Sequence, residues 1–140
     1  MKERLVQTYM DIAYKFSELS YAKRLQVGCI VVKDQKIIST GYNGTPSGAD
    51  NCCEDETGHT KLNVSHAEEN ALMKLCASTE SSDGAMIFIT HSPCIWCSKL
   101  INNAKIKKVF YSEDYRSDEG IKYLREYGVE VVKMDKKDKK

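Results

Sequence analysis

Two short segments constrain this chain more than any others: His66-Ala67-Glu68, and Pro93-Cys94-Ile95-Trp96-Cys97 further along. They supply an imidazole and two thiols, which are ligands that zinc binds well, and one carboxylate beside them. Structural zinc sites have four protein ligands, whereas catalytic sites have three and leave one position for water. The fold therefore has to bring these two segments together, and a catalytic metal site is the first hypothesis.

The cysteine pair fits the start of a helix. Cys94 and Cys97 are three residues apart, so on a helix they lie on one face. Pro93 just before them suits the first turn of a helix. Thiols at a helix N-terminus ionise more easily, and the thiolate is the form that binds a metal. Taken alone, a C-x-x-C pair also fits a redox motif, but its combination with His66 favours zinc.

The segment before the second helix allows two interpretations. Ser65-His66-Ala67-Glu68 fits a capping box, S-x-x-E, but a cap explains neither His66 nor the cysteine pair. Residues two apart do not share a helix face, so His66 and Glu68 reach one metal only if His66 lies at the very start of its helix. Two thiolates already neutralise the charge of zinc, so we expect a weakly acidified water. Glu68 is therefore predicted to take the proton of that water.

Size and composition describe one ordinary globular domain, expected to span residues 1–135 and to be followed by a lysine-rich tail at 136–140. No apolar run approaches the ~20 residues of a membrane helix, and the charged N-terminus does not resemble a signal peptide. We therefore expect a cytoplasmic protein with no membrane partner. The net charge of +1 gives no footprint for a nucleic-acid polymer. The tail could attract RNA, but a solvated, disordered terminus is the preferred interpretation, and a small-molecule substrate is favoured.

The six cysteines raise the question of a disulfide framework. In a reducing cytosol, metal binding or burial is the default instead. Cys29 lies in an apolar run, and Cys76 lies beside Leu72, Met73 and Leu75. Both are predicted to be small core residues.

Hydrophobic spacing predicts the order of the elements. Apolar residues between 5 and 19 recur at helical spacing and predict a first helix. Residues 27–32 and 36–40 predict a β-hairpin, and the polar stretch 41–65 predicts a long functional loop. Further on we expect helices at 66–77, 94–103 and 117–127, and strands at 86–90, 108–111 and 129–133. This order predicts an α/β/α sandwich of three layers around a five-stranded mixed sheet whose later strands are parallel.

Several segments belong together as one pattern: residues 27–32, G-Y-N-G-T-P-S-G at 41–48, N-C-C at 51–53, H-A-E-E-N-A at 66–71, T-H-S-P-C-I-W-C at 90–97, I-K-K-V-F-Y at 106–111, and Tyr115. The pattern resembles the deoxycytidylate (dCMP) deaminases of the cytidine deaminase superfamily, in particular its compact phage-encoded members. The zinc motif marks the superfamily, whereas the glycine-rich loop with N-C-C points to deoxycytidylate. The resemblance implies a cytidine deaminase-like fold and hydrolysis of dCMP to dUMP and ammonia for thymidylate synthesis, in the host cytoplasm if the gene is phage-borne.

The resemblance also implies roles at the metal. His66, Cys94 and Cys97 would hold one zinc ion per chain. Glu68 would deliver the proton of the water to the ring nitrogen and help the exocyclic amine leave. Some relatives carry a second, structural zinc, for which the possible ligands here lack an obvious fourth member, so one zinc is expected; these residues are Cys52, Cys53 and His59.

Substrate contacts are implied in the same way. The backbone at Ala67 would read the base, Asn43 would bond the sugar, and Tyr115 would stack on the pyrimidine. The phosphate needs cationic donors, for which Arg24 and Arg116 are the candidates. Ordinary surface arginines, and a turn residue at Asn43, remain the alternatives.

Regulation and assembly follow from the resemblance alone. Family members are commonly homohexamers, activated by dCTP and inhibited by dTTP, with a Mg²⁺-bound triphosphate near the glycine-rich loop. In this chain the triphosphate would lie near Gly41, Tyr42 and Gly44.

Two other functions stay open. A deaminase of polynucleotides, such as one acting on an adenosine in transfer RNA, is opposed by the weak basic charge. A zinc-stabilised interaction module without catalysis is opposed by the presence of Glu68 and by the lack of a fourth ligand. The sequence does not determine the phosphorylation level of the substrate, because deoxycytidine, dCMP and dCTP differ only at groups that the loop has to bind.

Overall fold

A computed structural model describes residues 2–115 and 117–135 of the chain. Arg116 and the lysine-rich tail at 136–140 lie outside these described residues. Along the chain, the elements are α1 (Glu3–Ser17), β1 (Gly28–Lys33), β2 (Lys36–Tyr42), α2 (Ala67–Cys76), β3 (Met86–His91), α3 (Ile95–Asn103), β4 (Lys108–Glu113), α4 (Glu119–Glu126) and β5 (Glu130–Lys133). Every helix and strand expected from the hydrophobic spacing is present in the expected order.

The five strands form one mixed sheet in the order β2-β1-β3-β4-β5. Strand β1 is antiparallel to both of its neighbours, β2 and β3, and a tight hairpin joins β1 to β2. Strands β3, β4 and β5 are parallel, and each is joined to the next by one helix. The predicted α/β/α sandwich with a five-stranded mixed sheet is thus confirmed.

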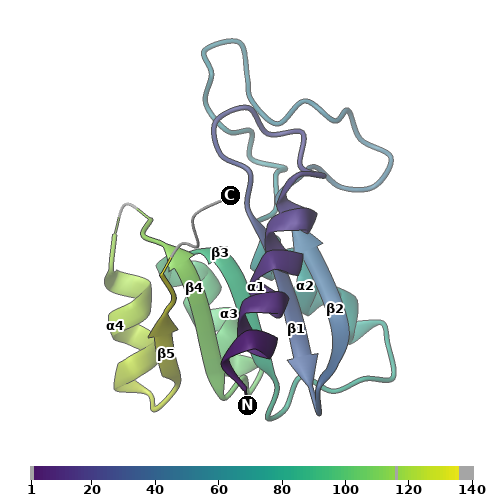
Figure 1. Cartoon of the computed structure of the whole chain (residues 1–140). Helices are drawn as coiled ribbons and strands as arrows, with labels where there is room; N and C mark the ends of the chain where they lie inside the picture. The colour runs from purple at the N-terminus through teal and green to yellow at the C-terminus, as the bar shows by residue number, and fades with distance from the viewer. Residues whose placement is uncertain (1, 116, 136–140) are drawn as a thin grey trace.

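Alternation along the strands divides the core into two layers. Ile30, Phe88 and Phe110 face α1, where they pack on Tyr9 and Met10. The intervening strand residues face the opposite side and pack against α2, α3 and α4; they include Cys29, Val31, Ile87, Ile89 and Val109. Figure 1 shows α1 crossing one face of the sheet, with α2 and α3 covering the other. Cys29 is fully buried, as predicted.

Two expectations about single elements are wrong. Strand β2 continues to Tyr42, so the irregular loop begins at residue 43 rather than 41. Cys76 is exposed rather than part of the core. The buried face of α2 runs through Ala71, Leu72 and Leu75, and Cys76 at the end of the helix is rotated away from the centre of that face.

The irregular segments gather at one end of the sheet, where β3 and β4 end. Figure 1 shows the loop between β2 and α2 at this end, beside the segment that joins α1 to β1. In sheets with parallel strands, ligands bind in the crevice at the carboxyl ends of the strands. Among the described residues, no helix is long and apolar enough to cross a membrane.

Candidate metal centre and active-site cavity

The starts of two helices bring the predicted metal ligands together. His66 is the N-cap of α2, Cys94 is the N-cap of α3, and Cys97 lies in the first turn of α3. His66 Nδ1 lies 3.2 Å from Cys97 Sγ and 3.6 Å from Cys94 Sγ. All three ligand atoms lie within 4.8 Å of one another, and this is the one such group of His, Cys, Asp and Glu side chains in the described part of the chain.

The spacing of these atoms fits zinc. Zn–S bonds of about 2.3 Å and Zn–N bonds of about 2.1 Å in a tetrahedron place the ligand atoms roughly 3.5–3.8 Å apart. Within residues 2–115 and 117–135 no fourth Cys, His or carboxylate joins the group. Cys52, Cys53 and His59 do not belong to it: the two thiols donate to the carbonyls of Glu54 and Asn51, and His59 Nδ1 lies 2.7 Å from Thr57 Oγ1.

Local backbone conformation explains how His66 and Glu68 serve one site. His66 is extended, with φ −72° and ψ 159°, so its side chain leaves the chain before helical geometry begins at Ala67. This meets the condition that His66 should lie at the very start of its helix. The alternative interpretation, a capping box of Ser65 and Glu68, is not what the structure has: Glu69 Oε1 accepts the His66 N–H at 3.3 Å instead. The cap is shifted by one residue, which leaves Glu68 to face the site.

Cys94 is also an N-cap and not, as expected, a residue of the helix. Its extended backbone lets Sγ accept the N–H of Cys97 at 3.4 Å. The Cys97 side chain and the His66 ring stabilise the Cys94 thiolate and lower the pKa of Cys94 to about 4. In return, the hydrogen bond to Cys94 and burial raise the pKa of Cys97, and the hydrogen bond to Cys94 raises the pKa of His66 to about 9. The lowered pKa of Cys94 provides one thiolate ligand, and a divalent cation would displace the protons held by Cys97 and His66.

Glu68 lies in the first turn of α2 and is buried, with 3% of its surface exposed. Burial raises the pKa of Glu68 to about 7. A carboxyl group whose pKa is near neutral can both accept and return a proton, which general acid–base catalysis requires.

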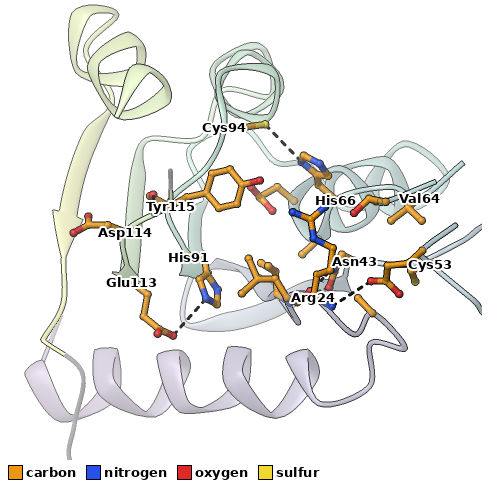
Figure 2. Close-up of a pocket in the computed structure, with 18 residues that line it drawn as sticks. Arg24, Asn43, Cys53, Val64, His66, His91, Cys94, Glu113, Asp114 and Tyr115 are labelled. Carbon is orange, nitrogen blue, oxygen red and sulfur yellow. Dashed lines mark hydrogen bonds and ion pairs between the residues drawn. The ribbon is translucent and has the colours of Figure 1, made fainter. Parts of the chain in front are cut away.

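A cavity of about 600 Å³ opens beside the metal cluster. Figure 2 shows His66 and Cys94 at one side of it and His91 and Glu113 at the other, with the Tyr115 ring reaching between them. Four predicted substrate residues line the cavity: Arg24, Asn43, Ala67 and Tyr115. A ligand of nucleotide size is compatible with such a volume.

Hydrogen bonds within the cavity wall hold the side chain of Asn43 and the backbone of Tyr115. Asn43 Oδ1 accepts the N–H of Val27 at 2.9 Å, and Asn43 Nδ2 donates to the carbonyl of Leu25 at 2.8 Å. The Asn43 amide therefore keeps one further N–H for a ligand. The backbone N–H of Tyr115 donates to Ser92 Oγ at 2.7 Å, which fixes the chain just after β4.

The cavity lining also includes residues that were not predicted from the sequence, among them His91, Glu113 and Glu54. His91 and Glu113 are the last residues of β3 and β4, and their side chains approach to 3.6 Å. The general rule that ligands bind at the carboxyl ends of parallel strands could have identified both. No sequence signal marks Glu54, which lies inside an irregular loop.

The residues expected near an allosteric triphosphate do not line this cavity. Gly41 lies in β2 where α2 crosses it: a Cβ atom there would come within 2.3 Å of the carbonyl oxygen of Ala67. Tyr42 accepts a hydrogen bond on its carbonyl from Asn70 Nδ2, and Gly44 pairs with Ser65 through two backbone hydrogen bonds. These contacts give the three residues packing roles independent of any nucleotide.

A three-ligand zinc cluster, a buried carboxyl group beside it and an adjoining cavity define the class, a zinc-dependent hydrolytic enzyme of α/β fold. Residues 3–113 match the family model of the cytidine and deoxycytidylate deaminase zinc-binding region, and all three ligands lie inside this match. The chain belongs to the cytidine and deoxycytidylate deaminase family.

Individual proteins are similar to this chain over most of its length. The chain is similar to the dCMP deaminase of the cyanophage S-TIM5, solved in complex with dCMP and dUMP, at 52% identity over 96% of this chain and 99% of that one, with a TM-score of 0.94. It is 31% identical to the deoxycytidylate deaminase of Enterobacteria phage T4 over 93% of this chain and 90% of that protein. It is 35% identical to ComE operon protein 2 of Bacillus subtilis, over 92% of this chain and 71% of the relative.

Proposed function

We propose that the protein is a zinc-dependent dCMP deaminase that hydrolyses dCMP to dUMP and ammonia. The observation that carries the proposal is the buried Glu68 beside the His66, Cys94 and Cys97 cluster at a cavity of nucleotide size. The substrate is suggested by the cyanophage relative, a dCMP deaminase that is 52% identical over nearly the whole chain.

The chain's own groups account for the proton transfers. Zinc, when bound, acidifies a water molecule so that it can act as a nucleophile. Glu68 would accept a proton from the attacking water, because its pKa is about 7 and its carboxyl group is shielded from solvent. It then delivers a proton to the ring nitrogen of cytosine, and a further proton transfer lets the amine leave as ammonia. Removal of Glu68 therefore removes the group that both accepts and donates the proton.

Substrate binding is proposed to use other residues of the cavity wall. The Tyr115 ring stacks on the pyrimidine, the backbone of Ala67 reads the base, and the remaining N–H of Asn43 bonds the sugar. Arg24 holds the phosphate, and its side chain points into the cavity in Figure 2. Arg116 stays a second candidate on the sequence alone.

Finer properties are proposed from the family resemblance. Residues 1–135 act as one catalytic domain that supplies dUMP for thymidylate synthesis. The enzyme is a homohexamer, activated by dCTP and inhibited by dTTP with Mg²⁺. A hyperbolic response to dCMP that neither nucleotide changes would contradict the regulatory part, and sedimentation as a monomer would contradict the hexamer.

The decisive experiment compares deoxycytidine, dCMP and dCTP as substrates of the purified, zinc-loaded protein. Loss of cytosine absorbance is followed with each, in the presence and absence of added dCTP or dTTP. We expect the highest kcat/KM with dCMP. Turnover of deoxycytidine alone, or of an RNA stem-loop but no mononucleotide, would contradict the proposal.

A further inference from the structure

Glu54 is a buried carboxylate in the cavity wall that the proposed reaction does not use. Only 8% of its surface is exposed. Its Oε2 accepts two backbone N–H groups, from Lys23 at 3.0 Å and from Arg24 at 3.3 Å. Its Oε1 is buried and has no hydrogen-bond partner among the described residues. A buried, half-satisfied carboxylate costs stability, so the residue calls for a functional explanation.

The backbone that presents Glu54 is well anchored. Glu54 and Thr60 form an antiparallel bridge across the loop. Next to it, the N–H of Lys61 donates to the carbonyl of Cys53 at 2.8 Å, and Cys53 is itself buried. The carboxylate therefore projects from a fixed point.

The segment that Glu54 holds has no regular structure of its own. Between the end of α1 and the start of β1, the chain forms neither helix nor strand. Two side chains of the long loop hold this segment by hydrogen bonds on either side of Arg24. Glu54 binds the amides of residues 23 and 24, and Asn43 binds the backbone of Leu25 and Val27. The position of the Arg24 side chain in the cavity thus depends on the hydrogen bonds of Glu54 and Asn43 (Figure 2).

We propose that Glu54 is a positioning residue that aims Arg24 at the 5′-phosphate and so sets the preference for dCMP over deoxycytidine. The inference rests on the proposed function, because Arg24 is the phosphate ligand proposed there. Glu54 itself does not contact the substrate. It acts through the backbone of residues 23 and 24, whose amides it binds.

The test measures kcat and KM for dCMP and for deoxycytidine with the full-length, zinc-loaded enzyme. In Glu54→Ala, the ratio of the two kcat/KM values is expected to fall about tenfold or more, mainly through a higher KM for dCMP, because small displacements of a positioning group weaken binding strongly. Glu54→Gln keeps an acceptor oxygen for both amides and should restore most of the ratio. Glu56→Ala is the matched control: it removes an exposed carboxylate from the same loop, and the ratio should stay within about twofold.

A double mutant distinguishes positioning from direct contact. If Glu54 acts through Arg24, then Arg24→Ala and Glu54→Ala lower the ratio no further together than Arg24→Ala does alone. Additive losses would overturn the proposal. A second result would also overturn it: Glu54→Ala lowers kcat/KM for dCMP but not for 3′-deoxy-dCMP. The carboxylate would then bind the sugar hydroxyl directly.

Further variants distinguish misfolding, failure of the proposed function and failure of the role of Glu54. If Glu54→Ala does not fold, Glu54→Asp retains the charge but shortens the side chain below the reach of both amides, and it should show the same fall in the ratio. A wild-type enzyme that does not prefer dCMP over deoxycytidine would contradict the proposed function. A wild-type preference that both Glu54→Ala and Glu54→Asp retain would contradict only the role of Glu54.

Discussion

Replacing Gly41 by alanine is expected to destabilise the protein and to slow catalysis, although Gly41 does not line the cavity. A Cβ atom there would lie 2.3 Å from the carbonyl oxygen of Ala67 and 2.8 Å from the nitrogen of Ala71. Heavy atoms pack at about 3.5 Å, so β2 and α2 have to separate by roughly 1 Å. Both neighbours are backbone atoms that cannot rotate away, and overpacking of this kind costs about 1–3 kcal/mol.

The same displacement reaches the metal centre. Helix α2 carries Glu68 in its first turn and begins directly after His66. A misplacement of about 1 Å can cost around 100-fold in rate. We therefore expect Gly41→Ala to lower both the free energy of unfolding and kcat.

Denaturation in urea and steady-state deamination of dCMP measure the two effects. Gly44→Ala is the control for stability, because the nearest atom to an added Cβ there is Tyr42 Cε2 at 4.0 Å, and its free energy of unfolding should change by less than about 0.5 kcal/mol. Wild-type stability and kcat in Gly41→Ala would refute the argument from close packing. Normal stability with altered inhibition by dTTP would instead support the nucleotide role that the family resemblance implies.

Three further outcomes are expected. Glu68→Gln should lower kcat by about 10²–10⁴-fold while metal analysis still finds one zinc per chain; an unchanged rate would mean that another group moves the proton. Removing zinc with a chelator should abolish deamination and lower the thermal midpoint, and added zinc should restore both; full activity of metal-free protein would refute the site. Burial and the hydrogen bond to Glu113 raise the pKa of Tyr14 from 10.0 to about 12. The protonated Tyr14 hydroxyl therefore stabilises the folded state below pH 10, and this contribution is lost as the pH rises from about 10 to about 12. The free energy of unfolding should fall less over this window in Tyr14→Phe, and equal falls would count against the assignment.

Much of the fold could be predicted because its signals are local. The apolar runs in β1, β3 and β4 and the helical spacing in α1 determine the elements without reference to the rest of the chain. Element ends were less accurate, because helix caps depend on tertiary partners. Cys94 became an N-cap and not a helix residue, since its thiol turns toward His66.

The side chains of the metal centre could also be predicted from the sequence. A histidine and two cysteines identify a metal that prefers nitrogen and sulfur, and a nearby glutamate supplies a carboxyl group, to which we assign the proton transfer. These properties belong to the side chains and to short spacings within one helix turn, so the sequence by itself determined them.

Only the tertiary structure decided what surrounds that centre. The path of a long loop placed Glu54 against the amides of Lys23 and Arg24, and the sheet order brought His91 beside Glu113. The crossing of α2 over β2 required glycine at position 41. Each contact joins residues distant along the chain, and its geometry depends on how layers pack and loops run, which no local pattern of residues specifies.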